Sequence, residues 1–479
     1  CAANLCVSAR RGDLTVGAGV QSGWRLRLAQ VLPWVTGIWF FAELLSLRLG
    51  LLSPFFFDTA HADVQGIDYF SLPKAWLNLQ AGHSLYGTFD PPPYGPHFTW
   101  YLAHPLLALV LGGPLSRLDP MDSYGVFTVL SLAVMAACAW LLARESDDAL
   151  VRRGLWLLLL GAFPTYLMLW VGNVQPFTVL GLTLLFLGML RVLRRGQAAG
   201  AYVLAGLLIS LFTKPVVLLM LPLLLLLRET RRQAFWALGI YLPVSLLCLV
   251  VPAVNPEGVG LSRVVWLVTH PAFVKATMDI YANGMALTPD MRDNSVHWLN
   301  LVAQSGFRFH HIDVDSLPAF LDGIFGTRTP DWIYWTPTLA VLSLSVGVAR
   351  LREDARRREA ALLLLLAASL NFFLAYPTAW EYQYTAVLPV GAVLLLLGPR
   401  SLLGPLRAWC LGLAAFAWLP SLYVLLGTGA PTARQVALVQ LDRVVPVTLL
   451  FLLLTWVVGK ACLRDAWRST PRRQLPEAV

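Results

Sequence analysis

Charged residues are scarce in this chain of 479 residues, because Asp, Glu, Lys and Arg make up only 13% of it. Soluble domains carry about 25% charged residues. Hydrophobic residues make up 57% of the chain, and its mean hydropathy is +0.64. Together these figures exclude a disordered protein, a disulfide scaffold and almost any soluble enzyme.

The chain also lacks any paired spacing among its six cysteines. Cys138, Cys248 and Cys410 fall within apolar runs, where cysteine usually behaves as a small buried hydrophobe. The cysteines therefore do not indicate a disulfide framework, and they do not reveal the redox compartment.

Long apolar runs dominate the sequence instead, and they predict α-helices that cross a bilayer, which takes about 20 residues each. The runs are continuous rather than alternating, which excludes a transmembrane barrel. The apolar segments lie at about 31–53, 101–118, 123–143, 154–171, 176–193, 198–213, 215–227, 234–252, 332–349, 361–376, 385–398, 408–427 and 443–459.

The distribution of arginine and lysine selects one topology. If every apolar segment crossed the membrane, the Arg-rich connections at 144–153 and 191–195 would fall on the wrong face. If segment 101–118 is instead re-entrant or interfacial, twelve crossings remain and both ends of the chain are cytoplasmic. In that arrangement 25 of the 36 Lys and Arg lie on the cytoplasmic side, and all eight histidines lie outside. We therefore predict an all-α polytopic membrane protein with about 12 transmembrane helices.

This topology divides the chain into a cytoplasmic N-terminal segment 1–30, one integral membrane domain over 31–459 and a cytoplasmic tail 460–479. We expect no cleavable signal peptide, because the first apolar run is already of spanning length. Two external loops are large, at about 54–100 and 253–331. Loops longer than about 15 residues are usually functional, so we expect the outer face to carry the activity.

The first large loop contains a segment that predicts an amphipathic helix at the membrane surface, from Tyr69 to Gln80. Phe70, Trp76 and Leu77 would turn towards lipid or the protein core. The helix would present its N-terminus at the boundary between water and membrane.

Asp68 stands at or just before the start of that helix, and two interpretations remain open. An aspartate at this position can cap the helix N-terminus. It can also serve as a general base at the membrane surface. Asp58 and Asp63 are rival carboxylates in the same loop.

Lys214 interrupts the apolar pattern between the segments 198–213 and 215–227, which are both short for a crossing. A charge in that position cannot easily face lipid. Short, proline-interrupted spans that meet at a charge are one way to build a site inside a membrane protein, and a lysine there suits an anionic ligand such as phosphate. The alternative is that the side chain snorkels to the outer surface.

Other polar segments fall on the same predicted face. The run Gly172–Gln175 links two spans, and it is either a plain turn or part of a site. Arg292 lies in the second large loop, and Trp380–Tyr384 joins two later spans. The run 310–315 contains two histidines and two aspartates but lacks a defined metal-ligand spacing, so we expect no metal site.

Taken in order, these motifs resemble those of glycosyltransferase family 87, whose members are polyprenol-phosphate-mannose-dependent α-mannosyltransferases with the C-type membrane glycosyltransferase fold. The late-loop histidine of the family is replaced here by Tyr382 and Gln383. The motifs that carry the resemblance are Asp68-Tyr69 with its following helix, Phe98–Tyr101 with His104-Pro105, Gly172–Gln175, Thr213–Pro215, and Trp380–Tyr384 followed by Pro389.

The resemblance implies transfer of a sugar, mannose or another hexose, from a polyprenyl-phosphate donor to a hydroxyl of a lipid or glycan acceptor. In that reaction Asp68 would be the general base of an inverting displacement. Lys214 and Arg292 would bind the donor phosphate. The residues expected to bind substrate are Trp100, Asn173, Gln175, Trp380, Tyr382 and Gln383.

The resemblance further implies an enzyme of the plasma (inner) membrane with its active site on the extracytoplasmic side, and no cofactor, metal or nucleic-acid partner. Two other function classes remain open. One is a transporter or a flippase for lipid-linked sugars, although the two halves of the chain show no repeat, which many transporters have. The other is a binding or assembly subunit without catalytic activity.

Overall fold

The structure is a computed structural model, and within the residues that it describes every regular element is a helix, with no β-strand. This confirms the predicted all-α class for those residues. The described residues are 23–52, 65–82, 85, 94–95, 101, 103–195, 200–250, 316–327, 329–375, 379–422, 425 and 432–469.

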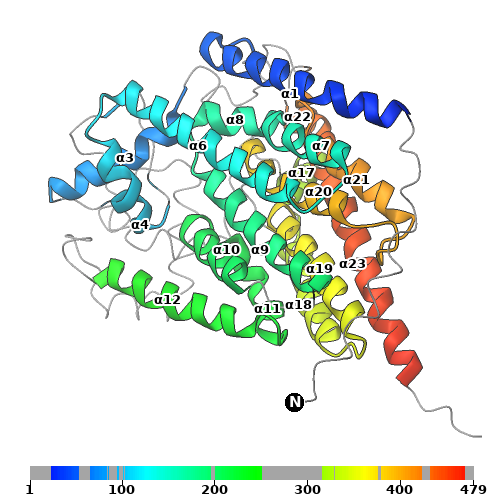
Figure 1. Cartoon of the computed structure of the whole chain (residues 1–479). Helices are drawn as coiled ribbons and strands as arrows, with labels where there is room; N and C mark the ends of the chain where they lie inside the picture. Colours follow the sequence, from blue (N-terminus) through cyan, green and yellow to red (C-terminus); the bar gives the residue numbers. More distant parts are fainter. Residues whose placement is uncertain are drawn as a thin grey trace, which may run out of the picture.

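The first half of the chain supplies α9, the helices α6 and α10 that pack against it, and the short broken helix beside α3 (Figure 1). Their bounds are α1 Gly23–Leu49, α3 Ile67–Gln80, α4 Pro105–Leu107, the π-helix η2 Ala108–Gly112, α5 Gly113–Leu115, α6 Pro120–Ala143, α7 Ala149–Leu160, α8 Phe163–Val171, α9 Gln175–Arg195, α10 Gly200–Thr213, the 3₁₀ helix η3 Pro215–Leu219, α11 Leu221–Leu226 and α12 Arg231–Val250.

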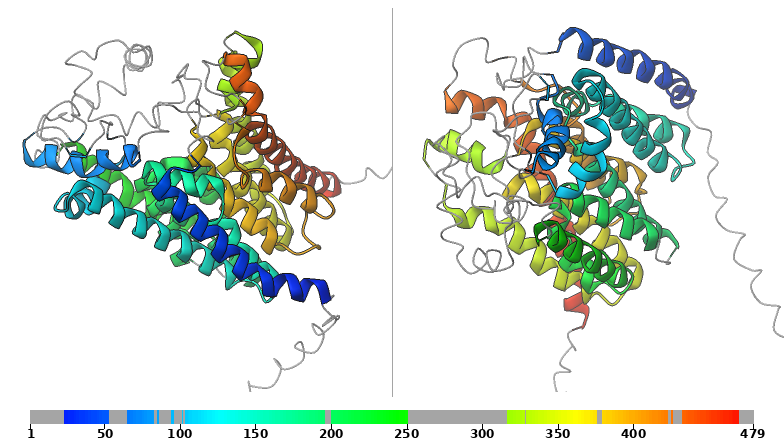
Figure 2. Two further views of the ribbon diagram at one scale, coloured as in Figure 1. Left: turned by 90° about the horizontal axis from the view of Figure 1, so that it is seen from above. Right: turned by 90° about the vertical axis from the view of Figure 1, so that its left-hand side faces the viewer.

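The second half packs against the other side of α9 (Figure 2). Its bounds are α17 Leu317–Phe325, α18 Asp331–Ala349, α19 Asp354–Ala375, the 3₁₀ helix η5 Glu381–Ala386, α20 Val387–Leu396, α21 Leu406–Phe416, α22 Ala433–Val439 and α23 Leu441–Ser469.

Six helical stretches in the described part of the chain are long and apolar enough to cross a bilayer. The protein is therefore an integral membrane protein, whereas the layout with twelve crossings stays a prediction. The six stretches are Gly23–Leu49, Pro120–Ala143, Ala149–Val171, Gln175–Arg195, Asp354–Ala375 and Leu441–Trp467.

The segment predicted to be re-entrant or interfacial forms a short broken helix, Pro105–Leu115. At about 1.5 Å per residue it reaches roughly 17 Å, about half of a hydrocarbon core of ~30 Å. Its π-helical part packs against α3 so closely that a Cβ atom on Gly112 would lie 2.5 Å from the carbonyl oxygen of Leu72. Glycine at this position therefore allows the broken helix to support α3.

Helix α9 lies at the centre of the core and contacts α6, α10, α19 and α20. Its approach to α10 depends on small residues, since a Cβ atom on Gly206 would lie 2.6 Å from the carbonyl oxygen of Gly181. Close contact through glycine is typical of helix pairs in membranes. Outer helices such as α1 and α12 instead expose large apolar side chains, including Trp34 and Phe235, as surfaces in contact with lipid do.

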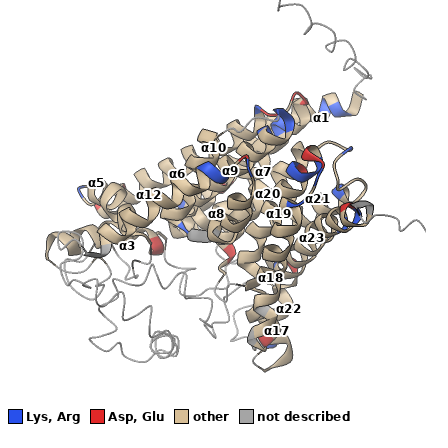
Figure 3. Ribbon diagram, turned by 90° about the horizontal axis from the view of Figure 1, so that it is seen from below, with Lys and Arg blue, Asp and Glu red and all other residues tan. Residues whose placement is uncertain are grey.

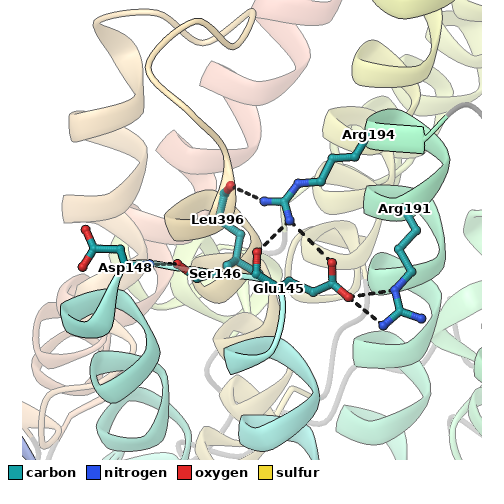
Figure 4. A network of polar contacts seen from close by, with 6 residues as sticks. All are labelled: Glu145, Ser146, Asp148, Arg191, Arg194 and Leu396. Carbon is teal, nitrogen blue, oxygen red and sulfur yellow. Dashed lines mark hydrogen bonds and ion pairs between the residues drawn. The ribbon is translucent and has the colours of Figure 1, made fainter. Parts of the chain in front are cut away.

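Arg-rich helix ends meet at the end of α9 that carries Arg191 and Arg194 (Figure 3). There Glu145 accepts from Arg191 at 2.6 Å, and Arg194 donates to the main-chain oxygen of Leu396 at 2.9 Å (Figure 4). These contacts join the α6–α7 connection, α9 and the end of α20. The opposite end of α9, at Gln175, is the end at which the candidate site lies.

Candidate active site

The first residue of the site, Asp68, lies in the first turn of α3. The residue that caps this helix is Gly66, with φ of 81°, and the cap has no side-chain hydrogen bond. The interpretation of Asp68 as the N-cap is therefore wrong, because α3 begins at Ile67, one residue earlier. A carboxylate in the first turn still benefits from the positive end of the helix dipole.

The predicted helix after Asp68 is present, and Phe70, which was expected to turn towards lipid or the protein core, is buried in the protein. Its location at the membrane surface stays a prediction. Most of its first three turns, including Tyr69, Phe70 and Lys74, is buried, because the broken helix and α6 pack around it. Trp76 is half-buried and lies against Gly113 of the broken helix. The segment is therefore packed against its neighbours in the protein, which fixes the position of Asp68.

Contacts with α8 and α6 hold the start of α3. The Gly66 N–H donates to the main-chain oxygen of Trp170 at 2.8 Å, and the hydroxyl groups of Tyr69 and Ser123 are hydrogen-bonded to each other. The turn after α8 also touches α3, since a Cβ atom on Gly172 would lie 2.5 Å from Cβ of Tyr69. Gly172 has φ of 70°, which a glycine adopts without strain. The turn thereby brings the next residue beside Asp68.

Asn173 connects two of the predicted site residues. Its Nδ2 donates to Oδ2 of Asp68 at 2.8 Å and to the hydroxyl oxygen of Tyr382 at 3.2 Å. Its Oδ1 accepts from the main-chain N–H of Gln175 at 3.0 Å, at the start of α9. This last bond fixes the orientation of the amide, so that the NH₂ group must face Asp68 and Tyr382.

Tyr382 is presented by η5, which packs against α8, α9 and α20. Nε2 of Gln175 donates to the main-chain oxygen of Gln383 at 3.3 Å, and Oε1 of Gln383 accepts from the Trp380 N–H at 3.2 Å. Tyr384 packs on Phe373 of α19, with ring centroids 4.3 Å apart. Gln175 and Gln383 are both buried, and their hydrogen bonds attach η5 to α9 and close the first turn of η5.

Lys214 lies between α10 and η3, outside the candidate spans, and approaches the same place. Its Nζ lies 5.2 Å from the centre of the Tyr382 ring, within cation–π range. Burial lowers the pKa of Lys214 to about 8, and the charge of Asp68 opposes this shift. Among the described residues, the Lys214 ammonium forms no hydrogen bond or ion pair. An ammonium in this setting can receive an anion.

The structure thus brings together Asp68, Asn173, Lys214 and Tyr382, from four different parts of the chain. Gln175, Trp380 and Gln383 lie next to this group, in or beside η5 and at the start of α9. The remaining predicted or rival residues are outside the described part of the chain: Asp58, Asp63, Trp100, Arg292 and the run 310–315.

The arrangement combines a carboxylate, oriented by an amide donor, with an ammonium group and an aromatic ring. A carboxylate can take a proton from a hydroxyl, and an ammonium can stabilise a leaving phosphate. No cluster of three or more His, Cys, Asp or Glu suited to a metal ion exists among the described residues. One residue near the site was not expected from the sequence: Arg443, whose Nη2 donates to Oε1 of Glu381 at the start of η5 at 3.1 Å. Its only signal in the sequence is a charge at the edge of an apolar segment.

Comparison with known proteins identifies one family. The model of glycosyltransferase family 87 matches residues 101–377, more than half of the chain. No curated protein and no solved structure matches. The chain therefore belongs to glycosyltransferase family 87 and is a membrane glycosyltransferase. Asn173 and Lys214 lie within the matched region, whereas Asp68 and Tyr382 lie on either side of it.

Proposed function

We propose that this glycosyltransferase moves a hexose, mannose in the first instance, from a polyprenyl-phosphate donor to a hydroxyl group of a lipid or glycan acceptor. The reaction inverts the configuration at the transferred carbon, with Asp68 as the general base. It takes place on the extracytoplasmic side of the plasma membrane. Membership of the family by itself gives only the class of enzyme.

The observation that carries the proposal is that one carboxylate and one ammonium group lie close together, next to the amide of Asn173 and the ring of Tyr382. Asp68 and Tyr382 share the NH₂ group of Asn173, and Lys214 lies over the Tyr382 ring. An inverting displacement needs one base for the acceptor and one cation for the leaving group. The four side chains supply these two functions without a covalent intermediate.

In the proposed step, the acceptor oxygen attacks the anomeric carbon of the sugar and forms the new glycosidic bond. The hydroxyl proton passes to a carboxylate oxygen of Asp68. The bond between the anomeric carbon and the phosphate oxygen breaks, and its electron pair leaves with the polyprenyl phosphate. Asn173 binds Oδ2 of Asp68 and so directs the second carboxylate oxygen towards the acceptor.

Lys214 stabilises the charge that develops on the departing phosphate, together with Arg292 as the sequence suggests. The proposed sugar and lipid contacts come from Asn173, Tyr382 and their neighbours. The residues proposed to complete this substrate-binding surface are Trp100, Gln175, Trp380 and Gln383. A lipid monophosphate leaving group needs no metal when side chains neutralise it.

The charge distribution supports an outer location. The site lies at the Gln175 end of α9, and the Arg-rich contacts of Glu145 with Arg191 and Arg194 lie at the other end. Membrane proteins keep their basic connections on the cytoplasmic side. Helix α9 then runs from an outer site to a cytoplasmic cluster of arginines.

The test is transfer of label from radiolabelled polyprenyl-phosphate mannose by the purified protein, with membrane lipids and glycans as acceptors. We expect Asp68→Asn to reduce transfer by roughly 10²- to 10⁴-fold, the usual contribution of a general base, without loss of folding. Asp58→Asn and Asp63→Asn serve as matched controls in the same loop. Wild-type rates in Asp68→Asn, with losses in either control, would refute the assignment of the base.

A further inference from the structure

A second charged group is buried close to η5, and the proposed chemistry does not use it. The Arg443 side chain is 1% exposed, at the start of α23. Its Nη2 donates to Oε1 of Glu381 at 3.1 Å, and Oδ2 of Asp442 lies 3.7 Å from Nη1. Its guanidinium also donates to the main-chain oxygens of Phe416, at 2.5 Å, and Leu419.

These bonds join three elements that are far apart in the sequence. Phe416 is the last residue of α21, Arg443 belongs to α23, and Glu381 opens η5. A planar guanidinium suits this role, since its donors point in several fixed directions at once. Residue 382, directly after Glu381, is the tyrosine that meets Asn173 and Lys214.

A buried ion pair is a costly way to gain stability. Removal of two charges from water costs about as much as their attraction returns, and apolar replacements are often equally stable. A buried pair beside a site can instead fix the geometry of the segment that carries it, which is a hypothesis to be tested in each protein.

We propose that Arg443 is a positioning residue, which acts through Glu381 to hold η5 so that Tyr382 reaches Asn173 and Lys214. The residue does not touch the reacting groups. The inference rests on the proposed function for its effect on catalysis, although the geometric part stands on the contacts alone. Arg443 and Glu381 both lie beyond the region that the family model matches.

The experiment compares three variants in detergent. Arg443→Met leaves Glu381 buried without its cation, whereas the double variant Glu381→Gln/Arg443→Met removes both charges. The matched control is Arg407→Met, because Arg407 also donates to main-chain oxygens, those of Leu394 and Leu395 at 3.0 and 2.9 Å, but at the other end of α20. The measurements are thermal unfolding, hydrogen exchange of the η5 amides, and transfer from polyprenyl-phosphate mannose.

We expect Arg443→Met to be less stable than the wild type, and the double variant to regain most of that loss, as is usual when both partners of a buried pair are replaced. Hydrogen exchange in η5 is nevertheless expected to be about tenfold faster in both variants. The kcat for transfer is expected to fall at least ~10-fold in both, because small displacements of a site group are costly. Arg407→Met is expected to keep the wild-type kcat and η5 exchange.

Two results would overturn the proposal. One is η5 exchange in Arg443→Met that equals the wild-type rate. The other is full activity in the double variant together with restored stability, which would show that Arg443 only neutralises the buried charge of Glu381 and does not position η5. If the wild type itself transfers no sugar from this donor, the proposed function fails, and the exchange data still decide whether Arg443 holds η5.

Discussion

The bridging role of Asn173 leads to a sharp prediction for an almost isosteric substitution, Asn173→Asp. The new carboxylate keeps an acceptor for the Gln175 N–H, so the start of α9 retains its hydrogen bond. It replaces the donor to Asp68 by a second anion. The change therefore leaves the local fold intact and reverses the interaction with the proposed base.

The magnitude follows from the distance of 2.8 Å between Nδ2 of Asn173 and Oδ2 of Asp68. Two unit negative charges at that separation repel by about 6 kcal/mol at an effective dielectric constant of ~20. The pair avoids this cost if the side chains separate or if they share a proton. Either response removes an oriented, ionised Asp68, so we expect Asn173→Asp to lose at least as much activity as Asn173→Ala.

Asn173→Ala removes one hydrogen bond to a charged group, which contributes about 1.5–3 kcal/mol. Since 1.36 kcal/mol corresponds to a factor of ten in rate, kcat should fall roughly 10- to 150-fold. Alanine also removes the acceptor at the start of α9, which costs about 1 kcal/mol of stability. Asn173→Asp should therefore be the more stable and the less active of the two variants.

The assay is single-turnover transfer from radiolabelled polyprenyl-phosphate mannose at saturating donor, with thermal unfolding measured on the same preparations. Tyr382→Phe is the matched control, because it removes the neutral partner of the amide at 3.2 Å and leaves Asp68 in place. That change should cost no more than about tenfold. Equal rates for the wild type and Asn173→Asp, or a higher rate for Asn173→Asp than for Asn173→Ala, would refute the reasoning.

Two further predictions concern the remaining parts of the site. Burial lowers the pKa of Lys214 to about 8, so its ammonium is lost as the pH rises through that value, and kcat/KM for the donor should fall above it. Lys214→Arg, whose charge persists, should flatten this part of the pH profile. An unchanged profile would contradict the role of Lys214 in binding the donor phosphate. Gly172→Ala and Gly326→Ala both place a methyl group at positive φ, 70° and 66°, and the backbone strain should cost each variant about 1–2 kcal/mol of stability, to which the contact with α3 adds at Gly172. Only the methyl group at Gly172 contacts α3, 2.5 Å from Cβ of Tyr69, so only Gly172→Ala should lose transfer activity. Equal activities of the two variants would show that the contact between this turn and α3 does not affect catalysis.

The sequence was sufficient to predict the class of fold and to select four residues that lie together in the structure. Continuous apolar runs predicted helices, and the described elements are all helical. Asn173 and Lys214 could be selected because each is a polar residue at an interruption of an apolar pattern, where a polar group is unexpected. Asp68 was selected as a carboxylate at the start of a predicted helix, and Tyr382 through the family resemblance. Their catalytic and binding roles remain predictions.

The details that failed depend on packing, which composition does not reveal. The start of α3 was misplaced by two residues, because the αL conformation of Gly66 is set by contact with α8 rather than by a local cap signal. The helix itself was expected to be amphipathic, but its polar residues Lys74 and Asn78 are buried, because neighbours such as the broken helix Pro105–Leu115 pack against it. The periodicity of apolar residues describes one helix at a time and does not show whether another helix packs against its polar face.

The four residues of the cluster share a structural reason for their location. Asn173 directly follows Gly172 and Asp68 stands two residues after Gly66, and both glycines have left-handed backbone. Lys214 precedes the 3₁₀ helix η3, and Tyr382 lies in the 3₁₀ helix η5. Interrupted helices leave main-chain groups without helical partners, which in a membrane protein must be satisfied by side chains or within a cavity.

The side chain of Asn173 both satisfies a main-chain group and orients a group of the site. Its oxygen satisfies a main-chain N–H at the start of α9, and its nitrogen orients the proposed base. A deletion such as Asn173→Ala removes the two functions together and cannot separate folding from catalysis. An exchange of the amide nitrogen for oxygen keeps the first function and abolishes the second. The stability and activity of Asn173→Asp, compared with those of Asn173→Ala, therefore test whether Asn173 serves the proposed catalysis or only stabilises the turn before α9.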